Sequence, residues 1–205
     1  MALATSRRDE SIDVVGLLVT MNESANRVAM HAVRRSLVKA QADRLGLPLT
    51  LLEIPEHCTN AIYEERMARA IDDARRDDIE HIVFGDLFLE DVRHYRENQL
   101  NGTGISPLFP LWGLPTDELA HSVIDAGVGA VITCVDPKQM SPAFIGRMFD
   151  ESLLEELPAD VDPCGERGEF HTFTFDGPGF SSPIDVEIGE VVERGGFVFC
   201  DVIPA

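Results

Sequence analysis

The densest set of side chains able to exchange protons lies within residues 162–178. Its acid or base candidates are Asp162, Glu166, Glu169, His171 and Asp176. Gly165 and Gly168 lie among them, and glycine lets the backbone approach a bound molecule closely. This segment predicts either a site for acid–base chemistry or a polar turn ahead of a strand, and its composition favours neither.

A metal site in the same segment is a further alternative. Its ligands would be Asp162, Cys164, Glu169 and His171, and its activity that of a metal-dependent hydrolase. These side chains mix hard oxygen donors with soft sulfur and follow no recognised ligand spacing. The sequence therefore predicts no resident metal.

A second set of charged side chains surrounds a predicted turn. Gly85 and Asp86 follow a predicted strand, and Arg93, Arg96 and Glu97 lie on the helix after it. Open α/β sheets bind ligands at the carboxyl ends of their parallel strands, so this turn is a candidate binding site. Arg93 and Glu97 are four residues apart on one helix face, and an ordinary surface ion pair is the simpler interpretation of that spacing.

An alternation of strands and helices must position both sets. In the first half, strands are expected at 12–20, 49–54 and 79–84, and helices at 33–45, 59–76 and 89–101. The first strand is almost continuously apolar, which is typical of a strand covered by helices on both faces. This order predicts an α/β fold with a parallel sheet and right-handed crossovers.

Glycine and proline concentrate in residues 101–115, which predicts a domain boundary there. We place it between domains 1–104 and 105–205. In the second domain, helices are expected at 116–126 and 144–157, and strands at 130–135, 170–175, 184–190 and 196–202. The second domain is therefore predicted to be smaller and of the α+β class.

The chain carries a net charge of −19, from 36 acidic and 17 basic residues. Unspecific nucleic-acid binding gains free energy from cations that neutralise phosphates, so this charge argues against direct nucleic-acid binding. Only Lys39 and Lys138 are lysines. An acidic, lysine-poor surface stays hydrated in concentrated salt, which suggests a halophilic source.

The four cysteines, Cys58, Cys134, Cys164 and Cys200, stand singly without a Cys-x-x-Cys pair. Reduced thiols in a cytoplasmic protein are the expectation. The first residues lack the apolar run of a secretory signal, and no segment is apolar for long enough to predict a membrane span.

Several motifs together resemble one family. They are Cys164-Gly-Glu-Arg-Gly-Glu-Phe-His-Thr-Phe173, Pro110-Leu-Trp112, Ile145-Gly-Arg-Met-Phe-Asp150 and the helix within 86–98. Their order and types are similar to those of diphthine–ammonia ligases, which are adenine nucleotide alpha hydrolase-like (HUP) proteins and PP-loop ATP pyrophosphatases. The likeness spans nearly the whole chain. It implies a HUP-like nucleotide-binding domain in residues 1–104 and a substrate-binding domain in residues 105–205.

The resemblance also implies roles for individual residues. Catalytic roles fall on Glu166, Glu169 and His171, although some members carry Glu at the position of His171. Nucleotide contacts fall on Thr20, Met30, His31, Gly85 and Asp86. Substrate contacts fall on Arg93, Glu97, Gly165, Gly168 and Thr172.

The implied activity is ATP-dependent amide formation, in which a carboxylate is adenylated and ammonia then attacks it. ATP and Mg would be the cofactors, and in an archaeal source the acid would be diphthine on elongation factor 2.

The family begins with a strand and a Ser-Gly-Gly-Lys-Asp-Ser loop that binds the ATP phosphates, as backbone N–H nests do. These 205 residues contain no such loop, and the start of the chain resembles the end of the helix that follows it. We therefore expect a sheet that lacks a central strand, through either a misplaced start or a degenerate copy. The alternative function is an inactive nucleotide-binding or scaffold remnant of the family.

Overall fold

The computed structural model describes residues 1–28, 31–55 and 58–205. The N-terminal half contains α1 (Ala2–Ser6), β1 (Leu17–Asn22), β2 (Arg27–Val28), α2 (Arg35–Leu45), β3 (Leu49–Ile54), α3 (Asn60–Arg76), β4 (His81–Val83), α4 (Glu90–Leu100) and β5 (Ser106–Leu108). The C-terminal half contains α5 (Thr116–Asp125), β6 (Gly129–Val135), the 3₁₀ turn η1 (Pro142–Phe144), α6 (Glu151–Glu156), β7 (Phe170–Asp176), β8 (Val186–Arg194) and β9 (Phe197–Pro204). This order confirms the mixed α/β class.

The parallel strands of the N-terminal half lie in two sheets rather than one. β1 and β3 pair in parallel from Leu17↔Leu49 to Asn22↔Ile54, and short β2 adds to β1. β4 and β5 form a separate parallel pair. Among the described residues, β1 and β4 belong to different sheets, so the single continuous sheet that the strand–helix alternation suggested is not formed. The HUP-like arrangement and the boundary after residue 104 stay predictions.

Local signals explain the helices of this half. Thr59 caps α3 by accepting the Ile62 N–H at 3.3 Å, and α2 ends at Gly46, whose φ of 66° is left-handed. β1 starts at Leu17 rather than at residue 12 because its partner β3 offers no residue before Leu49. The predicted helical start of the chain is confirmed as α1.

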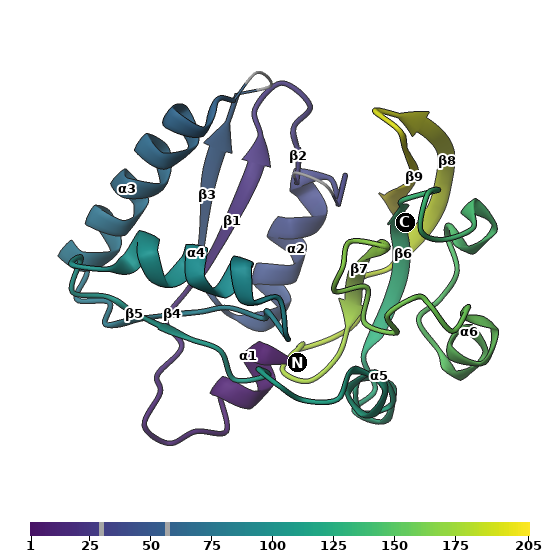
Figure 1. Cartoon of the computed structure of the whole chain (residues 1–205), viewed down its shortest axis with the longest axis horizontal. Coiled ribbons are helices and arrows are strands. Elements are labelled where there is room, and N and C mark those ends of the chain that lie inside the picture. Colours follow the sequence, from purple (N-terminus) through teal and green to yellow (C-terminus); the bar gives the residue numbers. More distant parts are fainter. Residues whose placement is uncertain (29–30, 56–57) are drawn as a thin grey trace.

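The C-terminal half is built on an antiparallel sheet of order β7-β6-β9-β8 (Figure 1). β8 and β9 join through a two-residue turn in which Gly195 and Gly196 both have positive φ. Such a turn matches the twist of a hairpin and favours glycine at both positions.

The predicted helix at 144–157 is wrong in its first half. Gly146 has a φ of 75°. The backbone around it bonds to β6: the Gly146 N–H donates to the Ile132 carbonyl at 2.9 Å, and the Ile132 N–H donates to the Arg147 carbonyl at 2.9 Å. The helix starts only at Glu151, where Asp150 caps α6. Pairing with a distant strand has overridden the local helical pattern.

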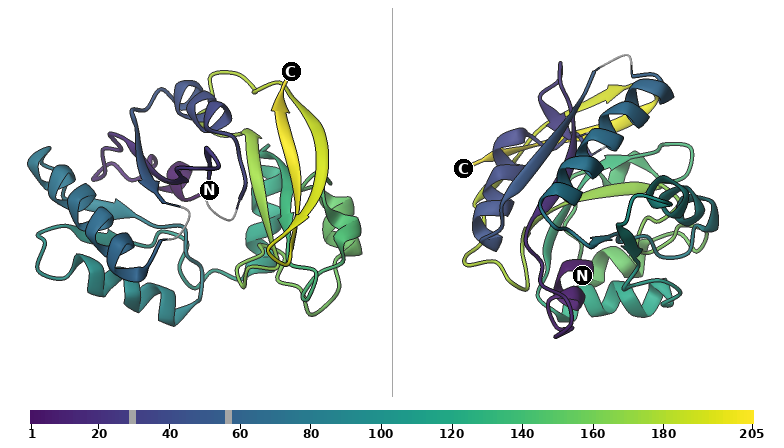
Figure 2. Two further views of the ribbon diagram at one scale, coloured as in Figure 1. Left: turned by 90° about the horizontal axis from the view of Figure 1, so that it is seen from above. Right: turned by 90° about the vertical axis from the view of Figure 1, so that its left-hand side faces the viewer.

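Helix α2 lies between the two halves (Figures 1 and 2). Its buried residues Leu37 and Val38 belong to one apolar cluster with Val131 of β6, Phe173 of β7 and Val202 of β9. Val19, Leu49 and Leu51 of the N-terminal sheet pack against the same cluster. Val33, just before α2, belongs to the same cluster, so this part of the chain also contacts the C-terminal sheet, where the predicted catalytic residue His171 lies.

Candidate functional site

The structure joins the two sets of charged residues that the sequence singled out. The Leu87 N–H, directly after Asp86, donates to the Glu166 carboxylate (Oε1) at 2.7 Å across 79 residues of chain. Around this contact, Leu87, Leu111 and Leu119 form a buried apolar cluster, with Cys164 packed against it. The turn after β4 is therefore in direct contact with residues 162–173, which we call the glycine–glutamate block.

The glycine–glutamate block is held by hydrogen bonds within the block. The Asp162 side chain accepts the backbone N–H groups of Cys164 at 2.9 Å and Glu166 at 3.3 Å, and its other oxygen accepts the Thr116 hydroxyl at 2.7 Å. Gly165 has a φ of 67° and lies so close to Phe170 that a Cβ would stand 2.7 Å from the Phe170 carbonyl oxygen. Glycine is required there by both conformation and space.

Glu169 is among the largest fully buried side chains, with 2% of its surface exposed. Its two carboxylate oxygens accept the backbone N–H groups of Asp162 and Arg167, each at 2.9 Å. Such bonds to a carboxylate are charge-assisted and hold the turn closed. These contacts are those of a residue that shapes the block, and its catalytic role stays a prediction.

Glu166 has the electrostatics expected of a proton acceptor. Burial raises its pKa, and the charges of Asp86 and Asp162 act in the same direction, while the N–H groups of Leu87 and Phe88 oppose the rise. A carboxyl group with a raised pKa is better matched to proton transfer near neutral pH than an ordinary one. Among the predicted catalytic residues, Glu166 therefore combines a raised pKa with a place at the junction.

Helix α4 presents a cation to the same region. The Arg93 guanidinium lies over two aromatic rings, 5.0 Å from the centre of Phe109 and 4.7 Å from that of Trp112, and donates to Glu97 at 2.8 Å. The expected i, i+4 ion pair is thus present. Arg96 points back toward Asp86 at 3.7 Å, and neither the Asp86 Oδ2 nor the Arg96 Nε has a hydrogen-bond partner among the described residues.

His171 lies in a different place from the glutamates. Its ring contacts that of His31 with centroids 4.5 Å apart, and His31 Nδ1 lies 3.4 Å from the Thr172 carbonyl oxygen. Burial, together with the nearby His31, lowers the pKa of His171 to about 4, so the imidazole is neutral at pH 7. No hydrogen bond or ion pair among the described residues connects His171 with Glu166 or Glu169. The predicted catalytic residues therefore fall into two groups.

The remaining predicted contacts are spread along the chain. Thr20 lies near the carboxyl end of β1, and Met30 lies outside the described residues. Gly168 closes the turn of the block by donating its N–H to the Gly165 carbonyl at 3.0 Å. Cys164 donates to the Thr116 carbonyl, and burial raises the pKa of its thiol to about 12, so it is a neutral residue of the turn.

Two ion pairs that no sequence motif predicts fasten the segment before α2 to the C-terminal sheet. Arg27 donates to Asp201 of β9 at 2.7 Å, and Arg34 forms a further pair with the same carboxylate. These guanidinium groups hold the pKa of Asp201 down at about 2. Nothing in the local pattern around residue 201 signals this role, because both partners are far away in sequence.

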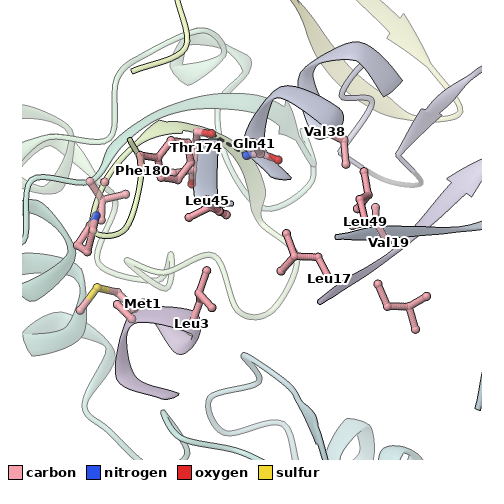
Figure 3. A pocket seen from close by; sticks show the side chains of 15 residues that line it. Met1, Leu3, Leu17, Val19, Val38, Gln41, Leu45, Leu49, Thr174 and Phe180 are labelled. Atoms are coloured by element: carbon pink, nitrogen blue, oxygen red, sulfur yellow. Dashed lines mark hydrogen bonds between the residues drawn. The ribbon is translucent and has the colours of Figure 1, made fainter. Parts of the chain in front are cut away.

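An apolar cavity of about 300 Å³ lies beside the first half of β1 (Figure 3). Leu3 of α1, Leu17 and Val19 of β1 and Leu45 of α2 line it, and Gln41 closes one side by donating to the Thr174 carbonyl at 2.6 Å. None of the predicted site residues lines it. Within the described chain, β1 pairs on this edge only through Met21 and Asn22, with β2.

The predicted nucleotide contacts suit a nucleoside better than a triphosphate. Thr20, His31 and Gly85 carry no positive charge, since the burial of His31 lowers its pKa, and Asp86 carries a negative one. Triphosphates bind through cations and backbone N–H nests. These four residues therefore supply no cation for the phosphates, and their contact with a nucleotide stays a prediction.

Residues 1–28, 31–55 and 58–205 contain no group of three or more His, Cys, Asp or Glu side chains arranged to hold a metal ion. In the same residues, every helix is too short or too polar to cross a membrane.

The chain is similar in sequence to diphthine–ammonia ligases of known name and to one family model. Residues 115–202 match the family model described as the diphthamide synthase C-terminal domain. The diphthine–ammonia ligase of Bos taurus is 31% identical over 132 residues, which are 62% of this chain and 49% of that protein. That of Homo sapiens gives the same values, and that of Mus musculus is 25% identical over 217 residues, 98% of this chain and 79% of that protein. The chain thus spans about half the length of the first two relatives, and the resemblance is confirmed.

Proposed function

We propose that this chain, a relative of the diphthine–ammonia ligases, takes part in ATP-dependent formation of an amide from a carboxylate and ammonia. The observation that carries the proposal is the bond between Glu166 and the Leu87 N–H. It unites the turn after β4 with the glycine–glutamate block, and both belong to the motifs that resemble the family.

In this proposal the residues at the junction bind and position the acid. ATP, when bound, converts the carboxylate to a mixed anhydride with AMP and releases pyrophosphate. Ammonia then forms the C–N bond as the C–O bond to AMP breaks, and one proton is released. Glu166 accepts that proton, since its raised pKa suits the transfer. Arg93, held over Phe109 and Trp112, provides a fixed cation for an anionic part of the acid.

Phosphate binding is the part that the described site residues do not supply. The resemblance places a strand and a phosphate loop before the helix that corresponds to α1. The open edge of β1 and the apolar cavity beside it would accommodate such a strand, because an added strand needs unpaired backbone groups and apolar cover. The ligase proposal therefore requires a phosphate-binding element in addition to these 205 residues.

An assay of AMP release tests the proposal. The protein is expressed with the in-frame codons upstream of Met1, and AMP is measured with and without ammonium for a panel of carboxylates that includes diphthine on elongation factor 2. We expect release that needs both ammonium and an acid, and a loss of about 100-fold for Glu166→Gln, in the range for a lost acid–base group. The exposed Glu155→Gln is the matched control.

A catalytically inactive scaffold is the second candidate, because the predicted nucleotide contacts Thr20, His31, Gly85 and Asp86 supply no cation for the phosphates. A stop codon shortly upstream of Met1, together with no AMP release from any acid, would favour it. Release that is independent of ammonium and unchanged by Glu166→Gln would reject the ligase proposal for this site.

A further inference from the structure

Strand β8 forms an exposed edge of the C-terminal sheet. In the order β7-β6-β9-β8 it pairs only with β9 within the described chain, and Figure 1 shows it at the outer side of the sheet. Ile188, Val191 and Val192 are 51%, 50% and 40% exposed. A bulge between Ile188 and Val191 interrupts β8, so its regular edge is Val191–Arg194. Unpaired backbone groups and exposed apolar side chains on such an edge are a template for an added strand.

The hairpin geometry shows which backbone groups are open. Arg194 and Phe197 flank the two-residue turn, and in such hairpins the flanking residues exchange hydrogen bonds with each other. The alternation of an antiparallel ladder then turns the N–H and C=O groups of Val191 and Glu193 away from β9. These groups face the open edge, where a further strand would bond to them.

The charges on the edge indicate which strand would fit. Glu187, Glu190 and Glu193 are all exposed along β8. Like charges directly opposite one another destabilise a strand pair, whereas opposite charges stabilise it.

We propose that the open edge of β8 binds an extended basic segment of a partner polypeptide as an added strand. Backbone bonds to Val191 and Glu193 supply affinity, and cationic side chains opposite the glutamates supply selectivity. This inference does not depend on the ligase proposal, because it concerns binding by a sheet edge alone.

Hydrogen exchange with two probe peptides tests the inference. The probes are capped peptides of about eight residues, one alternating Lys with Val and one alternating Glu with Val. We expect the Lys–Val peptide to slow exchange at the Val191 and Glu193 amides. Binding should weaken about tenfold or more with the double variant Glu190→Lys/Glu193→Lys. The matched control Glu64→Lys/Asp72→Lys, which makes the same charge change on exposed positions of α3, should alter affinity by less than about threefold.

A backbone variant adds a second test. Val191→Pro removes one outward N–H while leaving the bonds to β9, since proline is tolerated on edge strands, and it should weaken binding by the Lys–Val peptide. Three results would overturn the inference: equal protection by the Glu–Val peptide, no protection of β8 by either peptide, or protection that rises with protein concentration alone. The last would identify a second copy of the chain as the occupant. If Val191→Pro fails to fold, the affinities of Glu190→Lys/Glu193→Lys and of its control still test whether the Lys–Val peptide binds at β8.

Discussion

At the residue scale, the conformation of the glycine–glutamate block depends on glycines at which a Cβ atom would change the backbone. Gly165 and Gly168 both have positive φ, but only Gly165 lacks space for a side chain. The sequence predicted both glycines as site residues. It could not separate them, because the neighbour that crowds Gly165 is the Phe170 backbone in its folded position.

This difference makes the two glycines a matched pair. Gly165→Ala should lower the free energy of unfolding by about 2 kcal/mol or more, since the methyl group would meet a carbonyl oxygen in addition to the strained φ. The added methyl group of Gly168→Ala would have no atom within 4 Å, so this variant should lower the free energy of unfolding by only about 1 kcal/mol. Urea unfolding measures both. Equal losses would show that the block does not have the described conformation.

Protonation of His171 should link stability to pH. Its folded pKa of about 4 lies below the unfolded value near 6.5, so unfolding takes up a proton between these values. The contribution of His171 is therefore complete above about pH 6.5 and is lost as the pH falls toward about 4, with a total of roughly 3 kcal/mol. Denaturant unfolding from pH 7 to pH 4 measures the slope.

Two variants isolate this contribution. His171→Phe keeps a ring against His31 and should flatten the pH dependence, whereas His81→Gln, at an exposed histidine, should not. His31 also has a lowered pKa, so part of the slope should remain in His171→Phe. An unchanged slope in that variant would contradict the burial described for the histidine pair.

At the element scale, the sequence predicted most helices and strands because their signals are local. The cap at Thr59, the stop at Gly46 and the glycine pair at 195–196 all act within a few residues. Residues 145–149 were wrongly predicted as helical, because their backbone bonds to β6, a contact that the local pattern does not signal. The contact of Glu166 with Leu87 was hidden for the same reason.

Asp150 marks the true start of α6. Its Oδ1 accepts the Leu153 N–H at 2.9 Å and the Ser152 hydroxyl at 2.8 Å. Asp150→Ala should therefore lower the free energy of unfolding by about 1 kcal/mol, the usual loss for an N-cap. Urea unfolding beside the exposed control Glu155→Ala measures it. If the helix instead extended back through residues 145–149, as the sequence predicted, the loss would be close to zero.

At the scale of the whole molecule, two halves share one buried contact region along α2, and Arg27 and Arg34 fasten them at Asp201. A net charge of −19 acts against this packing through self-repulsion, which salt screens. We expect the melting temperature to rise between low and molar KCl. A control in which sucrose replaces KCl separates screening from solute exclusion, and maximal stability near zero salt would reject the halophilic interpretation.

If the junction of the two motif blocks serves amide formation, nitrogen from ammonium must appear in the product. The upstream-extended protein is incubated with ATP, the acid that supports AMP release and ¹⁵N-ammonium, and the product is analysed by mass spectrometry. We expect ¹⁵N in a new amide, in equal amount to AMP, and a parallel loss of both with Glu166→Gln. AMP release without ¹⁵N in the product would contradict the account.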